Sequence, residues 1–102
     1  MKGIHILLVE DNEGDVLLTQ EALEESKIIN KISVSRNGKD ALDFIFKRDI
    51  HFSADTPDLI LLDVNLPLKN GHEVLHELKN DESTKHIPII MLTTSSSERD
   101  IM

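Results

Sequence analysis

The stretch IHILLVED, residues 4–11, decides the fold of this 102-residue chain. Its first six residues form a nearly continuous apolar run, typical of a strand buried on both faces of a sheet, and its last two are the acids Glu10 and Asp11. A second run of this kind, LILLD at residues 59–63, ends in Asp63. Because ligands bind beyond the carboxyl ends of the strands in an open parallel sheet, we expect these three carboxylates to share one pocket.

Three carboxylates in one pocket repel one another. At a separation of about 5 Å and an effective dielectric near 20, each pair costs on the order of 3 kcal/mol, so a fold keeps such a cluster only with a neutralising group. A bound Mg²⁺ fits, because this hard cation takes carboxylate and carbonyl oxygens and keeps waters that a phosphate can displace. Taken alone, Glu10 or Asp11 would more often cap a helix, and the metal interpretation depends on Asp63 joining them.

Composition narrows the class of protein. The length suits one domain, and 39% apolar with 29% charged residues is typical of a soluble globular chain. A net charge of −8 argues against nucleic acid and anionic membrane surfaces as partners. The chain contains no Cys, which suits a reducing interior, and its first apolar run is too short for a signal peptide or a membrane span. We therefore expect a cytoplasmic protein.

Strand-like and helix-like segments alternate along the chain. Such alternation, with connections long enough to hold a helix, predicts parallel strands joined by right-handed crossovers and a doubly wound α/β fold. The first helix should carry a broad apolar face that includes Leu17 and Leu18. The expected strands are residues 4–9, 32–36, 59–62 and 88–92, and the expected helices are residues 15–26 and the segments that follow Asn37-Gly38 and Asn70-Gly71.

Four stretches together resemble the receiver domain of two-component response regulators. The resemblance covers essentially the whole chain and is closest to the small stand-alone regulators that partner bacterial phytochromes. It implies a flavodoxin-like receiver fold with strand order 2-1-3-4. The matching stretches are ILLVEDNEGDVLLTQEAL (6–23), RNGKDAL (36–42), PDLILLDVNLPLKNGHEVL (57–75) and IPIIMLTTS (87–95).

The resemblance assigns roles to the acids. Asp63 matches the phosphoacceptor, Asp11 matches the carboxylate that binds Mg²⁺ directly, and Glu10 matches the companion acid. Asn65 matches the position whose backbone carbonyl completes the metal shell. The resemblance therefore implies a switch, rather than an enzyme, in which Asp63 takes a phosphoryl group from a sensor histidine kinase or a phosphotransfer protein.

Three further positions match the family pattern. Thr93 matches the hydroxyl that reorients toward the phosphoryl group, while Pro67 and Gly71 match the residues that shape the loop beside the site. Lys69 lies in the same loop and is by default a solvated lysine. His72 and His76 stand four residues apart, a spacing that can bind Zn²⁺, but without an evident third ligand we interpret them as surface residues.

The resemblance also implies a fifth strand, which carries a lysine, and a fifth helix, whereas this sequence ends at Met102. We therefore expect residues 1–102 to form a C-terminally truncated receiver domain with an open sheet edge, which invites a homo-oligomer through strand pairing. Two alternatives stay open, namely a longer chain and a pseudo-receiver that binds partners without phosphorylation. A Mg²⁺-dependent phosphatase is disfavoured, because Asp63-Val64-Asn65 lacks the second Asp that would act as acid and base.

Overall fold

The computed structural model describes residues 3–92, and within this part strands and helices alternate as expected. The strands are β1 (Ile4–Val9), β2 (Ile29–Ser35), β3 (Leu59–Asp63) and β4 (Ile89–Leu92). The helices are α1 (Glu13–Glu24), α2 (Gly38–Ile45) and α3 (Gly71–Lys79), with a short 3-10 helix, η1 (Asp49–His51), after α2.

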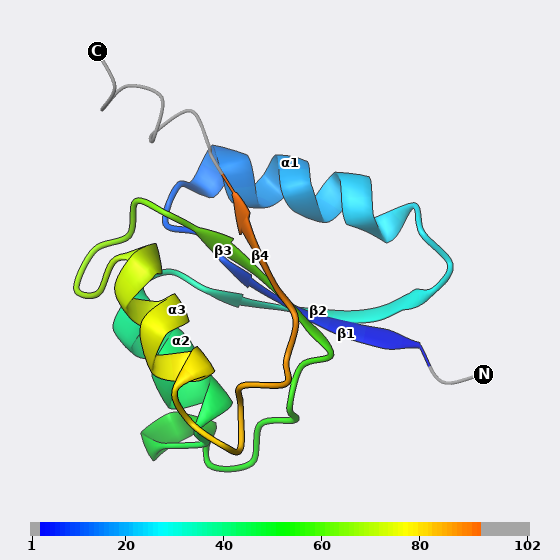
Figure 1. Cartoon of the computed structure of the whole chain (residues 1–102). Helices are drawn as coiled ribbons and strands as arrows, with labels where there is room; N and C mark the ends of the chain where they lie inside the picture. The colour runs from blue at the N-terminus through cyan, green and yellow to red at the C-terminus, as the bar shows by residue number, and fades with distance from the viewer. Residues whose placement is uncertain (1–2, 93–102) are drawn as a thin grey trace.

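The four strands form one parallel sheet in the order β2-β1-β3-β4. This order confirms the predicted doubly wound α/β fold. Helix α1 covers one face of the sheet, and α2 and α3 lie side by side on the other, as Figure 1 shows. β1 and β3 are the inner strands, so the chain runs out of the sheet at adjacent points after Val9 and after Asp63. This juxtaposition places the acids of the two segments together.

The hydrophobic core lies mainly between the sheet and the helix pair α2 and α3. The side chains of the inner strands alternate between the two faces, and those of Leu7, Val9, Ile60 and Leu62 join this larger cluster. The smaller cluster lies under α1 and includes Ile6, Leu8, Val16 and Leu61 among its buried members. Burial of β1 and β3 on both faces explains why their sequences are nearly continuously apolar.

The first helix starts earlier than predicted. α1 begins at Glu13 because the side chain of Asn12 accepts a hydrogen bond from the backbone N–H of Asp15 (3.0 Å) and caps the helix there. Gly14 therefore lies within the first helical turn. β2 likewise begins at Ile29, three residues before its predicted start at Ile32.

The broad apolar face predicted for α1 is wrong. Val16 is buried and Leu23 packs against the same cluster, but Leu17 is 51% exposed and Leu18 is 67% exposed. Successive helical residues are about 100° apart, so three in a row cannot all face the sheet. None of the helices in residues 3–92 has the length and apolar character needed to cross a bilayer.

Candidate metal centre

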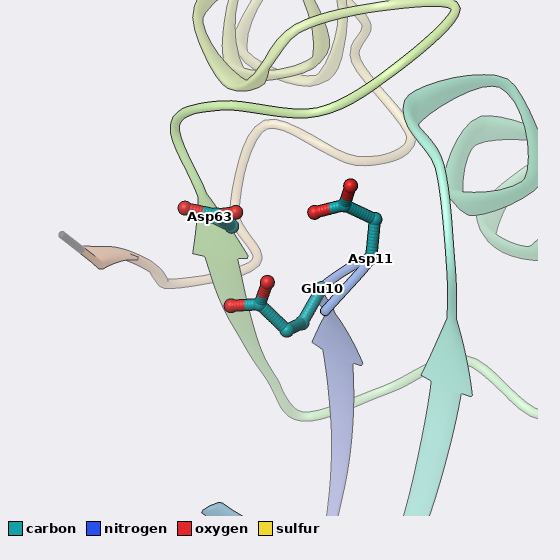
Figure 2. Close-up of side chains that lie close together, drawn as sticks. All are labelled: Glu10, Asp11 and Asp63. Atoms are coloured by element: carbon teal, nitrogen blue, oxygen red, sulfur yellow. The ribbon is translucent and has the colours of Figure 1, made fainter. Parts of the chain in front are cut away.

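The three predicted acids meet at the carboxyl ends of β1 and β3. One carboxylate oxygen from each of Glu10, Asp11 and Asp63 lies within 4.8 Å of the others. Figure 2 shows Glu10 and Asp11 at the end of β1 and Asp63 at the end of β3, with their carboxylates gathered in one place. We refer to these three side chains as the acidic triad.

Local backbone contacts hold Glu10 in place. Its N–H donates to the carbonyl of Ser35 on β2 (3.0 Å), and its carboxylate Oε2 accepts from the N–H of Asn12 (3.1 Å). Glu10 is 1% exposed, whereas Asp11, which follows it, is exposed. The triad therefore combines buried carboxylates with a solvent-facing one, as expected for a site that is covered by the protein on one side and open to solvent on the other.

Asp63 is fully buried at the last position of β3, opposite Leu92 of β4. Beyond it the chain turns into the β3–α3 loop, residues 64–70. Gly71 closes this loop, because its N–H donates to the carbonyl of Val64 (2.9 Å). A Cβ on Gly71 would lie 2.4 Å from the Asp63 carbonyl oxygen, so this position accepts no larger residue without a shift of the loop. The loop-shaping role of Gly71 stays a prediction.

The electrostatics of the triad favour a cation or a proton. Burial is the largest of the effects that raise the pKa of the Glu10 carboxyl, followed by the charge of Asp63 and a hydrogen bond to it. Against the lowering effect of the Asn12 N–H, these effects together bring the pKa to about 7. Glu10 thus holds its proton near neutral pH when nothing else neutralises the site. A divalent cation would replace this proton.

The donor set fits Mg²⁺. Octahedral coordination at 2.0–2.1 Å places ligand oxygens about 3–4 Å apart, and the triad oxygens lie within 4.8 Å of one another, so a small closure would bring them into range. Oxygen donors alone, with one solvent-facing carboxylate, suit a hard cation that retains waters.

The remaining predicted residues lie around the triad or outside the described part of the chain. Asn65 is exposed on the bend two residues after Asp63, and the Pro67 carbonyl accepts hydrogen bonds from the N–H groups of Lys69 (2.8 Å) and Gly38 (3.3 Å). Thr93 lies beyond Leu92, outside the described residues.

Other polar residues that the sequence singled out have structural partners or face solvent. The Lys69 ammonium pairs with Glu77 on α3 at 2.9 Å, which directs it along that helix. His72 and His76 are both exposed, in agreement with their interpretation as surface residues. Two features escaped sequence reasoning, namely the raised pKa of Glu10 and the close contact between Gly38 and Lys69. The first depends on burial and the second on a contact between distant segments, and neither leaves a local pattern in the sequence.

Comparison with known proteins assigns the class. Residues 6–102 match the response regulator receiver domain family, and the chain belongs to this family. Among its relatives, the response regulator Rcp1 of Synechocystis sp. is 43% identical over 97 residues, which are 95% of this chain and 66% of Rcp1. The polar-differentiation response regulator DivK of Brucella ovis is 38% identical over 95 residues, which are 93% of this chain and 70% of DivK.

Solved structures agree with this assignment. The phosphorylated cyanobacterial phytochrome response regulator RcpA superposes with a TM-score of 0.86 at 44% identity, covering 97% of this chain and 71% of RcpA. The Mn²⁺-bound form of Rcp1 gives the same TM-score at 43% identity, with coverage of 96% and 70%. The family and fold expected from the sequence are therefore confirmed. The chain spans about two thirds of the length of these phytochrome response regulators.

Proposed function

We propose that this chain is a phosphoacceptor switch in which Asp63 accepts a phosphoryl group in a Mg²⁺-dependent reaction. The observation that carries this proposal is the acidic triad, in which the buried Asp63 carboxylate lies beside two further acids at the edge of a parallel sheet. Membership of the receiver family supports it, as does the Mn²⁺-bound form of the relative Rcp1.

The reaction is an in-line phosphoryl transfer to a carboxylate. An oxygen of Asp63 attacks the phosphorus of a phosphohistidine, and a new P–O bond forms as the P–N bond breaks. The bonding electron pair leaves with the imidazole nitrogen, which then takes a proton, and Asp63 is left as an acyl phosphate. Such a transfer depends on positioning and charge neutralisation more than on covalent assistance, and β3 and the β3–α3 loop supply a fixed position for the acceptor.

Glu10, Asp11, Asp63 and the backbone carbonyl of Asn65 would hold the metal. When bound, Mg²⁺ offsets the negative charge of the carboxylates and of the phosphoryl oxygens. Glu10 and Asp11 would hold the ion at the end of β1. Because Glu10 is buried, the fully ionised triad is unfavourable without a cation. Thr93 would donate its hydroxyl to the phosphoryl group, and Pro67 and Gly71 would shape the loop.

The donor is a sensor histidine kinase or a phosphotransfer protein, and the readout is a contact with another protein. Membership of the receiver family supports this part of the proposal, as does the likeness to RcpA, a phosphorylated phytochrome response regulator. A cytoplasmic location agrees with such a donor.

Acetyl phosphate tests the proposal without a kinase. The chain is incubated with acetyl phosphate and Mg²⁺, and intact mass spectrometry follows the addition of one phosphoryl group. We expect phosphorylation of the natural sequence, none of Asp63→Ala, and none when EDTA removes the metal. A folded chain that binds Mg²⁺ but takes up no phosphoryl group would support a partner-binding pseudo-receiver instead.

A further inference from the structure

The N-terminus of α2 lies directly against the β3–α3 loop. Gly38, the first residue of α2, is buried, and a Cβ at this position would lie 1.9 Å from the carbonyl oxygen of Lys69 and 2.7 Å from its Cβ. The N–H of Gly38 also donates to the Pro67 carbonyl at 3.3 Å. Two segments thirty residues apart therefore touch backbone to backbone, and only glycine permits this distance.

The β3–α3 loop, on the other side of this contact, contains a residue in an unfavourable backbone conformation. Leu68 has a φ of 68°, in the left-handed region that a branched side chain rarely adopts, and the N–H of Lys69 donates back across it to the Pro67 carbonyl at 2.8 Å. The Leu68 side chain is 74% exposed, so its own packing does not fix this conformation. Such a residue persists where the surrounding structure holds it.

The end of the β3–α3 loop is held by hydrogen bonds to the start of α3. Asn70 and Glu73 form a reciprocal capping box at the start of α3, in which the Asn70 side chain accepts from the Glu73 N–H (3.0 Å) and the Glu73 carboxylate accepts from the Asn70 N–H (3.2 Å). With Gly71 closed onto Val64, both ends of the loop are anchored to α3 and β3, and Gly38 supports its middle.

We propose that Gly38 is a positioning residue for the metal centre, because its contact with Pro67 and Lys69 holds the β3–α3 loop, which carries Asn65 two residues after Asp63. This inference rests on the proposed function, in which the Asn65 carbonyl is a metal ligand. The geometry of the phosphorylation site would then depend on the start of α2 as well as on β3. A larger side chain at position 38 has to push the loop outward, away from α2.

Binding of Mn²⁺, measured by electron paramagnetic resonance as the loss of the free-ion signal, tests this role independently of phosphorylation. Gly38→Ala is compared with Gly14→Ala, a matched control in the first turn of α1, where a Cβ would meet only the Asn12 side chain at 3.3 Å. We expect Gly38→Ala to weaken Mn²⁺ binding about tenfold and to slow phosphorylation by acetyl phosphate. Gly14→Ala should bind as the natural sequence does.

A double variant separates positioning from stability. Gly at position 68 tolerates a positive φ and many other conformations, so Gly38→Ala with Leu68→Gly lets the loop move away at low cost. We expect this double variant to regain much of the urea midpoint lost in Gly38→Ala while its Mn²⁺ affinity stays low. Where Gly38→Ala alone does not fold, the comparison of the double variant with Leu68→Gly serves the same purpose.

The outcomes are distinct. Folded Gly38→Ala that binds Mn²⁺ within twofold of the natural sequence overturns the inference alone. The inference also fails where affinity and stability return together in the double variant, since the effect then comes from the fold as a whole. Failure of the natural sequence itself to bind Mn²⁺ overturns the proposed function, and this inference with it.

Discussion

Replacing Asp63 by Asn should stabilise the metal-free chain at alkaline pH. The pKa of the Glu10 carboxyl is raised from 4.5 to about 7, which means that the folded chain disfavours the ionised form of Glu10 by about 3 kcal/mol. Burial is the largest cause and persists in the variant, while the charge of Asp63 and the hydrogen bond between the two carboxyl groups are removed. We therefore expect Asp63→Asn to raise the free energy of unfolding by about 1–2 kcal/mol.

The sign of the pH dependence follows from the direction of the shift. Because the folded chain binds the Glu10 proton more tightly than the unfolded chain does, the stability from this source is complete below pH 4.5 and is lost as the pH rises through about 7. The gain from Asp63→Asn should consequently be large at pH 8.5 and small at pH 5. Added Mg²⁺ should stabilise the natural sequence at pH 8.5, by about 2.7 kcal/mol at one hundred times its Kd, and should stabilise Asp63→Asn much less.

Urea unfolding followed by far-UV circular dichroism is the assay, because the chain has no Trp or Tyr to report by fluorescence. Unfolding is measured at pH 5 and pH 8.5, with EDTA or with Mg²⁺. Glu21→Gln, which removes an equal charge from an exposed position of α1, is the control and should leave the Mg²⁺ effect unchanged. An equal gain from Asp63→Asn at both pH values, or a loss at pH 8.5, would refute the electrostatic reasoning.

Three further predictions follow from particular contacts. Gly71→Ala should lower the free energy of unfolding by about 1–3 kcal/mol, because the new Cβ would lie 2.4 Å from the Asp63 carbonyl oxygen. The same variant should bind Mg²⁺ more weakly in calorimetry, and an unchanged Kd would contradict the loop-shaping role. Burial, as the largest cause, lowers the pKa of His5 below 6.5, so the stability of the fold should fall as the pH drops below 6.5. In thermal unfolding, His5→Phe should flatten this decline, and an equally steep decline in the variant would mean that other groups cause it. Ile90 is 49% exposed on β4, at one edge of the described sheet, so light scattering should show self-association that Ile90→Lys abolishes, and a monomer at the highest soluble concentration would show that this edge does not pair.

The order of elements was predictable because the apolar patterns of β1 and β3 are strong. Both strands are inner strands of a parallel sheet and are buried on two faces, and few other structures require such continuous apolar runs. The acids that follow these runs were predictable for the same reason, since the topology brings the carboxyl ends of adjacent strands together. The turns Asn37-Gly38 and Asn70-Gly71 marked two helix starts correctly.

The features that were not predicted depend on contacts in the folded chain, which a local sequence pattern does not contain. The start of α1 was predicted two residues too late, because the hydrogen bond from the Asp15 N–H to the Asn12 side chain, which caps the helix, forms only in the folded chain. Leu17 and Leu18 are exposed because their burial depends on which segments cover α1. Gly38 matched a turn signal, and its contact with Lys69 exists only in the folded chain. The role of Thr93 stays a prediction, since it lies outside the described residues.

The position of the acidic triad at the ends of the two innermost strands has a consequence for local opening. Backbone amides in such central strands exchange with solvent mainly through global unfolding, whereas edge strands and loops open more readily. The peptide hydrogens of Leu8 and Leu61 should therefore be among the slowest to exchange with deuterium. The strand ends that carry Glu10 and Asp63 would then stay side by side while peripheral segments open and close, so a loss of the site through local opening should begin in the loops rather than in these strands.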